Sequence, residues 1–196
     1  MSGKAAVRSE LLAARALLSS EDARKAASVL ARRAGDLAEL AGARTVAAYV
    51  SVGREPGTRV LLDTLRARGV AVLLPVLRAD NDLDWARYEG TERLVRAGRG
   101  LWEPDGARLG LDAVVAAEVV LLPGLAVDAR GMRLGRGGGS YDRVLARLEE
   151  AGATPTLAVL LYDDEVLARV PEEPHDRPVH AVVTPGGVRR FTDVRP

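Results

Sequence analysis

The chain has 196 residues, of which 28 are Lys or Arg and 27 are Asp or Glu, so its formal net charge is +1. A chain of this length can bury a full hydrophobic core, and we expect one α/β domain over residues 1–196. The near-zero net charge argues against nucleic acid or an anionic membrane surface as the main partner. The sequence contains no Cys, which excludes disulfide bonds, thiolate zinc sites and a cysteine nucleophile.

No apolar run approaches the roughly 20 residues that a membrane-spanning helix needs. Arg8, Glu10 and Arg15 interrupt what would have to be the apolar core of a signal peptide. We therefore expect a cytoplasmic protein without a membrane partner. The sequence does not report the oligomeric state, and a monomer is the starting expectation.

The first predicted helix covers residues 4–18, where apolar residues recur at helical spacing. Lys4 and Arg8 lie one turn apart on this helix and therefore share a face. Taken alone, the pair fits two solvated charges on a surface helix better than a binding site. Ser19 or Ser20 can then cap a second helix, which is predicted to run to about residue 41 and to be structural.

Strands and helices alternate along the rest of the chain. Strands are predicted at residues 44–50, 70–75, 83–88, 119–122, 156–161, 179–184 and 188–191, and helices at 58–68, from 91, at 141–148 and at 163–168. The first strand, helix and strand of this series imply a right-handed crossover and a parallel strand pair. The pattern predicts an α/β protein with a mostly parallel sheet.

The most distinctive stretch is a glycine-dense loop, residues 131–139, which follows a buried apolar strand and leads into a helix at Tyr141. Glycines let the backbone reach positive φ and let an anion approach bare N–H groups, and Arg133 and Arg136 add positive charge. A glycine-rich loop by itself is equally consistent with a flexible surface loop. The two arginines, Tyr141 and Asp142 together favour a site for a nucleotide and its metal.

A dinucleotide-binding fingerprint is the competing interpretation of this loop, because Gly135, Gly137 and Ser140 nearly match its spacing. That fingerprint follows the first strand of a βαβ unit, with an acidic residue at the end of the second strand. Here the loop lies two-thirds along the chain and contains arginines, so the dinucleotide interpretation is discounted.

Written as PG-x-A-x-D-x-x-G-x-RLG-x-GGG-x-YDR, residues 123–143 resemble the signature of the 5-formyltetrahydrofolate cyclo-ligase family, also called methenyltetrahydrofolate synthetase. The resemblance covers nearly the whole chain. It implies a three-layer, Rossmann-like α/β sandwich with a mostly parallel central sheet. It also implies that the protein closes 5-formyltetrahydrofolate to 5,10-methenyltetrahydrofolate and converts ATP, its co-substrate, to ADP and phosphate.

The implied reaction runs through an imidate phosphate. The formyl oxygen is a poor leaving group, so ATP first phosphorylates it; N10 of the folate then attacks the formyl carbon and phosphate leaves. This chemistry needs positioning and charge neutralisation rather than a protein nucleophile.

The resemblance assigns roles to particular residues. It implies ATP binding by Lys4, Arg8, Arg133, Leu134, Gly135, Arg136, Gly137, Gly138, Gly139, Ser140 and Tyr141. It implies folate binding by Val50, Glu55, Arg136, Gly137, Gly138, Gly139 and Ser140. Arg136 and Lys4 would act in catalysis, and Asp142 and Asp176 would bind Mg²⁺, the expected cofactor. The family usually carries an acid four residues after the second Asp, where this sequence has His180.

Three aromatic residues, Trp85, Tyr88 and Trp102, cluster before the glycine loop. Core packing is the simplest role for them, although Tyr88 or Trp102 could also form a wall for the flat pterin ring.

Two other classes of function stay open at this point. A non-catalytic folate- or nucleotide-binding paralogue could keep the fold, but it would be free to lose some of the charged residues, and all of them are present. A sugar-phosphate isomerase or an acyl-CoA transferase of related architecture would need a carboxylate base and no ATP.

Overall fold

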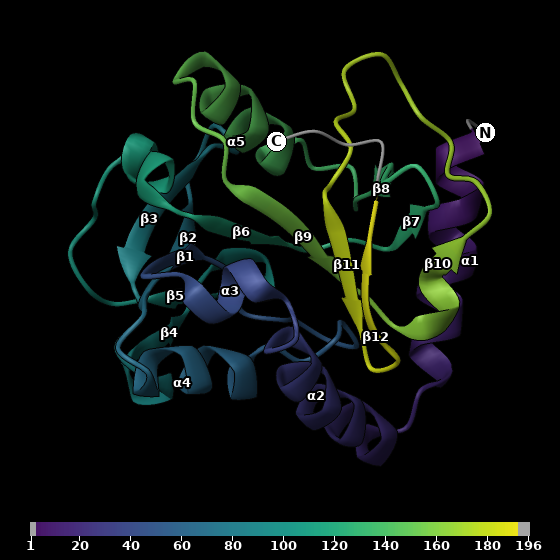
Figure 1. Ribbon diagram of the computed structural model, residues 1–196, viewed down its shortest axis with the longest axis horizontal. Helices are drawn as coiled ribbons and strands as arrows, with labels where there is room; N and C mark the ends of the chain where they lie inside the picture. Colours follow the sequence, from purple (N-terminus) through teal and green to yellow (C-terminus); the bar gives the residue numbers. More distant parts are fainter. Residues whose placement is uncertain (1–2, 192–196) are drawn as a thin grey trace.

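The structure is a computed structural model and describes residues 3–191. Its centre is a seven-stranded sheet with the order β12-β11-β9-β6-β1-β2-β3 (Figure 1). Its strands are β1 (Thr45–Ala47), β2 (Ala71–Leu77), β3 (Leu83–Arg87), β6 (Val119–Leu122), β9 (Thr156–Leu160), β11 (Ala181–Thr184) and β12 (Gly187–Arg190). The five inner strands are parallel, and β3 and β12 run antiparallel at the two edges. The predicted mostly parallel sheet is confirmed.

Helices cover both faces of this sheet, which is why the inner strands are apolar on both sides. The helices are α2 (Ser20–Ala34), α3 (Ala38–Gly42) and α4 (Arg59–Ala67) on one face, and α5 (Ser140–Glu150) with the 3₁₀ helix η3 (Leu111–Ala116) on the other. Side chains of β6 alternate between the two cores: Val119 and Leu121 pack with the first group, and Val120 and Leu122 with the second. The predicted three-layer architecture is confirmed.

Two smaller sheets complete the structure. They are β10-β7-β8, made of β7 (Ala126–Asp128), β8 (Arg133–Leu134) and β10 (Val166–Leu167), and the hairpin of β4 (Leu94–Arg96) and β5 (Trp102–Pro104). The first of them supports helix α1 (Gly3–Leu17), because Val7 and Leu11 pack on Ala126, Leu134 and Val170. In Figure 1 this helix stands apart from α2, α3 and α4, next to β10.

Three helix predictions were wrong. The second predicted helix ends at Ala34, and α3 starts separately after a turn at Gly35, a poor helix former. The segment predicted as a helix at residues 163–168 is a single 3₁₀ turn, η4 (Asp163–Glu165), followed by β10. There the Glu165 carboxylate folds back to accept the backbone N–H of Tyr162 at 2.9 Å, which closes the turn instead of extending it. The helix predicted from residue 91 is likewise a single 3₁₀ turn, η1 (Thr91–Arg93), followed by β4. A further 3₁₀ turn is η2 (Gly98–Gly100).

The unexpected His180 has a structural contact. Its Nδ1 accepts the backbone N–H of Leu157 at 2.8 Å, and its own backbone N–H donates to the carbonyl oxygen of Leu157 at 2.9 Å. The residue thus aligns the start of β11 with the start of β9. Within residues 3–191, none of the helices has the length and apolar character of a membrane span.

Candidate active site

A cavity of about 560 Å³ lies at the carboxyl ends of the central strands. Tyr49 and Val50 follow β1, Pro75 and Leu77 belong to the end of β2, and Pro123 follows β6, and all five line the cavity. In open, mostly parallel α/β sheets this edge is where ligands usually bind.

Every residue that the sequence predicted to bind ATP, folate or metal lines this one cavity. The set comprises Lys4, Arg8, Val50, Glu55, Arg133, Leu134, Gly135, Arg136, Gly137, Gly138, Gly139, Ser140, Tyr141, Asp142 and Asp176. The fold therefore brings four distant parts of the chain to one place. Which ligand each residue contacts stays a prediction.

The glycine loop contains β8 and ends at the start of α5. Gly137 and Gly139 have φ of +92° and +75°, a region that residues with a Cβ rarely adopt. Gly139 is the N-cap of α5 and provides no side-chain oxygen for the first N–H groups of the helix. These N–H groups, at Ser140 and Tyr141, begin a helix at the cavity and can bind an anion such as phosphate.

Arg8 connects helix α1 to this loop. Its Nε donates to the carbonyl oxygen of Gly135 at 2.8 Å. Its guanidinium also lies against Gly137, where an added Cβ would come within 3.1–3.2 Å of three of its atoms. A positive charge is thus fixed directly beside the backbone that would hold phosphate.

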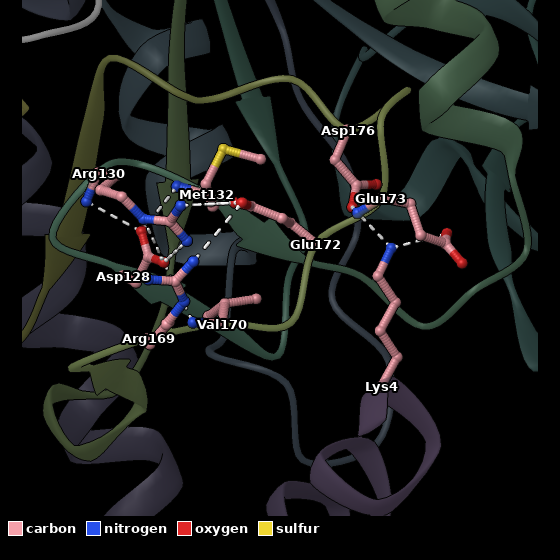
Figure 2. Close-up of polar contacts among 9 residues, drawn as sticks. All are labelled: Lys4, Asp128, Arg130, Met132, Arg169, Val170, Glu172, Glu173 and Asp176. Atoms are coloured by element: carbon pink, nitrogen blue, oxygen red, sulfur yellow. Dashed lines mark hydrogen bonds and ion pairs between the residues drawn. The ribbon is translucent and has the colours of Figure 1, made fainter. Parts of the chain in front are cut away.

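Lys4, one turn earlier, is held by two carboxylates of the loop after β10. Its Nζ lies 2.6 Å from Asp176 Oδ2 and 2.9 Å from Glu173 Oε2, as Figure 2 shows. Partial burial opposes the charge on the amine, but the hydrogen bonds to the two carboxylates outweigh it and raise the pKa of Lys4. Burial likewise opposes the charge on Asp176, and the bonds from Lys4 and from the N–H of Glu173 lower its pKa.

The far end of α1 is anchored by a buried ion pair. The guanidinium of Arg15 meets the carboxylate of Glu165 through two contacts of 2.6 and 2.9 Å, and it also donates to the carbonyl oxygen of Gly124 at 2.7 Å. Both side chains are less than 5% exposed. This pair fixes the helix that carries Lys4 and Arg8.

Glu55 brings a largely buried carboxyl group to the cavity. Its Oε2 accepts the N–H of Val52 at 2.8 Å, and its Oε1 lies 3.5 Å from Nε of Arg136. Burial raises the pKa of Glu55, although the Val52 N–H and Arg136 act against this. The group can therefore take part in hydrogen bonds as an acceptor or, more readily than an exposed Glu, as a donor.

Two residues that line the cavity each have a buried polar atom without a hydrogen-bond partner within the described part of the chain: Arg133 Nε and Tyr141 Oη. Such atoms are nearly always paired in folded proteins, so their position points to a polar ligand. The rest of the Arg133 guanidinium donates to the carbonyl oxygen of Pro123 at 2.9 Å and lies 3.9 Å from Asp142 Oδ1. Burial lowers the pKa of Arg133, against the opposing charge of Asp142.

Residues 1–185 match the model of the 5-formyltetrahydrofolate cyclo-ligase family. The chain belongs to this family. It is 48% identical to the 5-formyltetrahydrofolate cyclo-ligase of Mycolicibacterium smegmatis over 72% of the chain and 74% of that protein, and 32% identical to that of Escherichia coli K12 over 74% and 80%. The solved 5,10-methenyltetrahydrofolate synthetase of Aquifex aeolicus superimposes with a TM-score of 0.81 at 27% identity, covering 98% of this chain and 95% of that one.

The carboxylates at the cavity suit a hard divalent cation, because Mg²⁺ prefers oxygen ligands and needs only one or two of them from protein. Asp142, in the first turn of α5, is 46% exposed and its nearest ion-pair contact is long, so its oxygens are accessible. Asp176 already shares Oδ2 with Lys4. Among residues 3–191, three ligand atoms come within 4.8 Å of one another at Glu173, His175 and Asp176, a group that does not contain Asp142.

Of the two aromatic residues considered for a ring-binding wall, only Trp102 lines the cavity. Its ring lies 4.7 Å from the guanidinium carbon of Arg96 and 5.1 Å from that of Arg59. The prediction that Tyr88 could form a wall for the pterin ring is wrong, because this side chain is buried and its hydroxyl group donates to Asp63 at 2.6 Å. Trp85 is likewise core.

Several cavity residues were not predicted from the sequence. They are Tyr49, Val52, Pro75, Leu77, Leu83, Arg99, Leu101, Glu103, Pro123, Gly124, Glu173 and His175. The apolar ones carry no chemical signature, although many follow the ends of predicted strands, where a ligand site was to be expected. Glu173 and His175 could have been noticed as neighbours of Asp176.

Proposed function

We propose that the chain catalyses the ATP-dependent closure of 5-formyltetrahydrofolate to 5,10-methenyltetrahydrofolate, as the names of its relatives indicate for those proteins. The observation that carries the proposal is the convergence of cations, an uncapped helix start and an apolar wall on one cavity. A phosphorylated substrate and a flat ring system need these two kinds of surface side by side.

The phosphate end of the cavity is formed by α1 and the glycine loop. Lys4 and Arg8 supply positive charge, and the N–H groups at the start of α5 supply hydrogen bonds to phosphate oxygens. Phosphoryl transfer depends mainly on such positioning and charge neutralisation. ATP is the co-substrate in this proposal.

The folate end is formed by the apolar residues after β1 and at the end of β2, with Trp102 and the largely buried carboxyl group of Glu55. Arg136 lies between the two ends, since it comes from the glycine loop and pairs with Glu55. In this arrangement the formyl oxygen takes the γ-phosphoryl group and ADP leaves. N10 then bonds to the formyl carbon and loses its proton, while the carbon–oxygen bond breaks and phosphate departs.

Asp142, and Asp176 through Oδ1, which does not contact Lys4, would hold Mg²⁺ in this proposal. The ion, when bound, neutralises negative charge on the phosphate groups. A monomeric state, a cytoplasmic location and the absence of nucleic-acid and membrane partners stay predictions.

The direct test incubates the pure protein with 5-formyltetrahydrofolate and Mg-ATP and follows the absorbance of the methenyl product. We expect product in amounts equal to the ADP released. Tight binding of both substrates without product would instead favour the non-catalytic paralogue.

Asp142→Asn tests the proposed metal role. An Asp in the first turn of a helix can simply interact favourably with the helix dipole, and this interaction stabilises a protein by about 0.3–1 kcal/mol. If that is the only role of Asp142, the Asn variant should keep nearly full activity. If Asp142 is a metal ligand, Asp142→Asn should fold normally, and its activity should fall by about 10²-fold and recover in part at high Mg²⁺. Titrating Mg²⁺ against turnover distinguishes the two roles.

Asp22→Asn is the matched control, because Asp22 lies in the first turn of α2 and is exposed. Its Mg²⁺ curve should coincide with that of the wild type. If the curve of Asp142→Asn also coincides, Asp142 does not bind the metal.

A further inference from the structure

Asp128 is a fully buried carboxylate whose role is not explained by ligand binding. It is the Asp of the glycine-loop signature, but it does not line the cavity. Its Oδ1 accepts the backbone N–H of Arg130 at 2.9 Å and that of Met132 at 3.2 Å. Its Oδ2 accepts the N–H of Val170 at 3.1 Å and the guanidinium of Arg130 at 2.7 and 3.2 Å (Figure 2).

These bonds join two parts of the chain that are far apart in sequence. One is the end of β7 with the turn that follows it, where the glycine loop begins. The other is residues 170–178, here named the clamp loop, which contains no helix and only an isolated bridge between Pro178 and Met132. Because the loop has no regular secondary structure, its position depends on the contacts of its side chains and on the hydrogen bonds at its two ends.

The turn after β7 holds the clamp loop at both ends. Asp128 binds the N–H of Val170 at the beginning, and the carbonyl oxygen of Gly131 accepts the N–H of Val179 at 2.8 Å just after the end. Between them, Arg130 Nη1 contacts the carboxylate of Glu172 at 2.8 and 3.0 Å. One guanidinium thus joins a buried carboxylate to the middle of the loop.

The residue after Glu172 is the first of the two carboxylates that hold Lys4. Figure 2 shows Glu172 directed toward Arg130 while Glu173 and Asp176 face the Lys4 ammonium. A shift of the loop at Glu172 would therefore move both contacts of Lys4.

We propose that Asp128, Arg130 and Glu172 are positioning residues that fix the clamp loop so that Glu173 and Asp176 hold the Lys4 ammonium at the phosphate end of the cavity. The consequence for ATP rests on the proposed function, but the arrangement of Lys4 does not. None of the three residues needs to touch a substrate. They determine where the first cation of the site stands.

The lysine content of the chain allows a test that requires no turnover. The sequence has two lysines, Lys4 and Lys25. The side chain of Lys4 is 11% exposed and held by two carboxylates, whereas that of Lys25 is 68% exposed with one partner on its own helix. Trace acetylation with acetic anhydride at pH 8, without divalent ions, should modify Lys4 more slowly than Lys25, as measured by mass spectrometry of the two sites.

Glu172→Ala removes the link between Arg130 and the loop while leaving the buried Asp128–Arg130 pair in place. We expect the ratio of Lys4 to Lys25 acetylation to rise severalfold, with thermal unfolding close to that of the wild type. In the turnover assay, KM for Mg-ATP should rise by roughly tenfold, while KM for 5-formyltetrahydrofolate changes little. Arg130→Met should give the same changes in acetylation ratio and KM by a second route, with a loss of stability because the buried Asp128 carboxylate loses its cation.

Arg169→Ala is the matched control. Arg169 also faces Glu172, but at 3.9 Å and with 75% of its side chain exposed, so it should contribute little. An unchanged acetylation ratio in both Glu172→Ala and Arg130→Met would overturn the proposal, even if these variants were less stable. Absence of turnover in the wild type would contradict the proposed function and leave the acetylation result to be judged separately.

Discussion

Gly138→Val is expected to abolish turnover without unfolding the protein. A Cβ built on Gly138 meets no atom within 4 Å, and its φ lies outside the left-handed region, so valine fits the fold. The stability of the variant should stay within about 0.5 kcal/mol of the wild type. However, Gly138 lines the cavity beside the start of α5, and a branched side chain there excludes phosphate from the bare N–H groups. Misplacement of this kind lowers turnover by about 10²-fold or more.

Gly137→Ala provides the comparison for this variant. At Gly137, φ is +92° and the new Cβ would press on the Arg8 guanidinium, so this change should lower both stability and activity. Thermal unfolding and the methenyl absorbance assay measure the two effects separately. Normal turnover by Gly138→Val would show that phosphate does not bind at this loop.

Arg15→Met is expected to have the largest effect on stability. Methionine fills much of the same space but leaves the Glu165 carboxylate buried without its cation, since both side chains are less than 5% exposed. Removing one partner of a buried ion pair costs about 3–5 kcal/mol. Urea unfolding measures the loss, and Arg24→Met, an exposed arginine on α2, is the control that should change little.

The loss of stability in Arg15→Met should depend on pH in a defined direction. Burial raises the pKa of Glu165, and the bonds from Arg15 counteract this, so removing Arg15 raises that pKa further. The pKa of this carboxyl group is then higher in the folded protein than in the unfolded chain. Its contribution to stability is fully present below the unfolded-state pKa and is lost as the pH rises through the folded-state pKa. The deficit should therefore be smaller at pH 5 than at pH 8.

Adding Glu165→Gln to Arg15→Met supplies the control, since the neutral amide cannot titrate. The double variant should recover part of the lost stability at pH 8 and show much less pH dependence. A deficit in Arg15→Met that is equal at both pH values would contradict the assignment of Glu165 as the responsible group.

Much of the fold could be predicted because hydrophobic periodicity and the order of strands and helices are local signals. The apolar run 119–122 identified a strand buried on both faces, and the structure places it in the middle of the sheet. The errors occurred where a distant partner decides local structure. Glu165 closes a turn because Arg15, 150 residues earlier, holds its carboxylate. The residues near Glu165 in the sequence give no indication of that contact.

The site was predictable where residue types carry chemistry. Lys4 and Arg8 share a helix face, and in the structure both line the cavity together with residues of the glycine loop. The partners of these residues were not predictable. That Lys4 is held by Glu173 as well as Asp176, and that Asp128 fixes the loop bearing them, follows from tertiary contacts between loops without regular structure.

Helix α1 lies outside the central sheet, and the hydrogen bonds from its side chains to the rest of the protein join residues 109 to 172 positions apart. Contacts that span such distances close late in folding, because the chain between them must be ordered first. The apolar cluster on which the helix packs is also small, and such small clusters open locally at a lower free energy than the main core. We therefore expect α1 to behave as a separate cooperative unit: its amide hydrogens exchange through undocking of the helix while the seven strands stay paired. The protein would then withdraw Lys4 and Arg8, two of the cations proposed to bind phosphate, from the cavity without losing its fold.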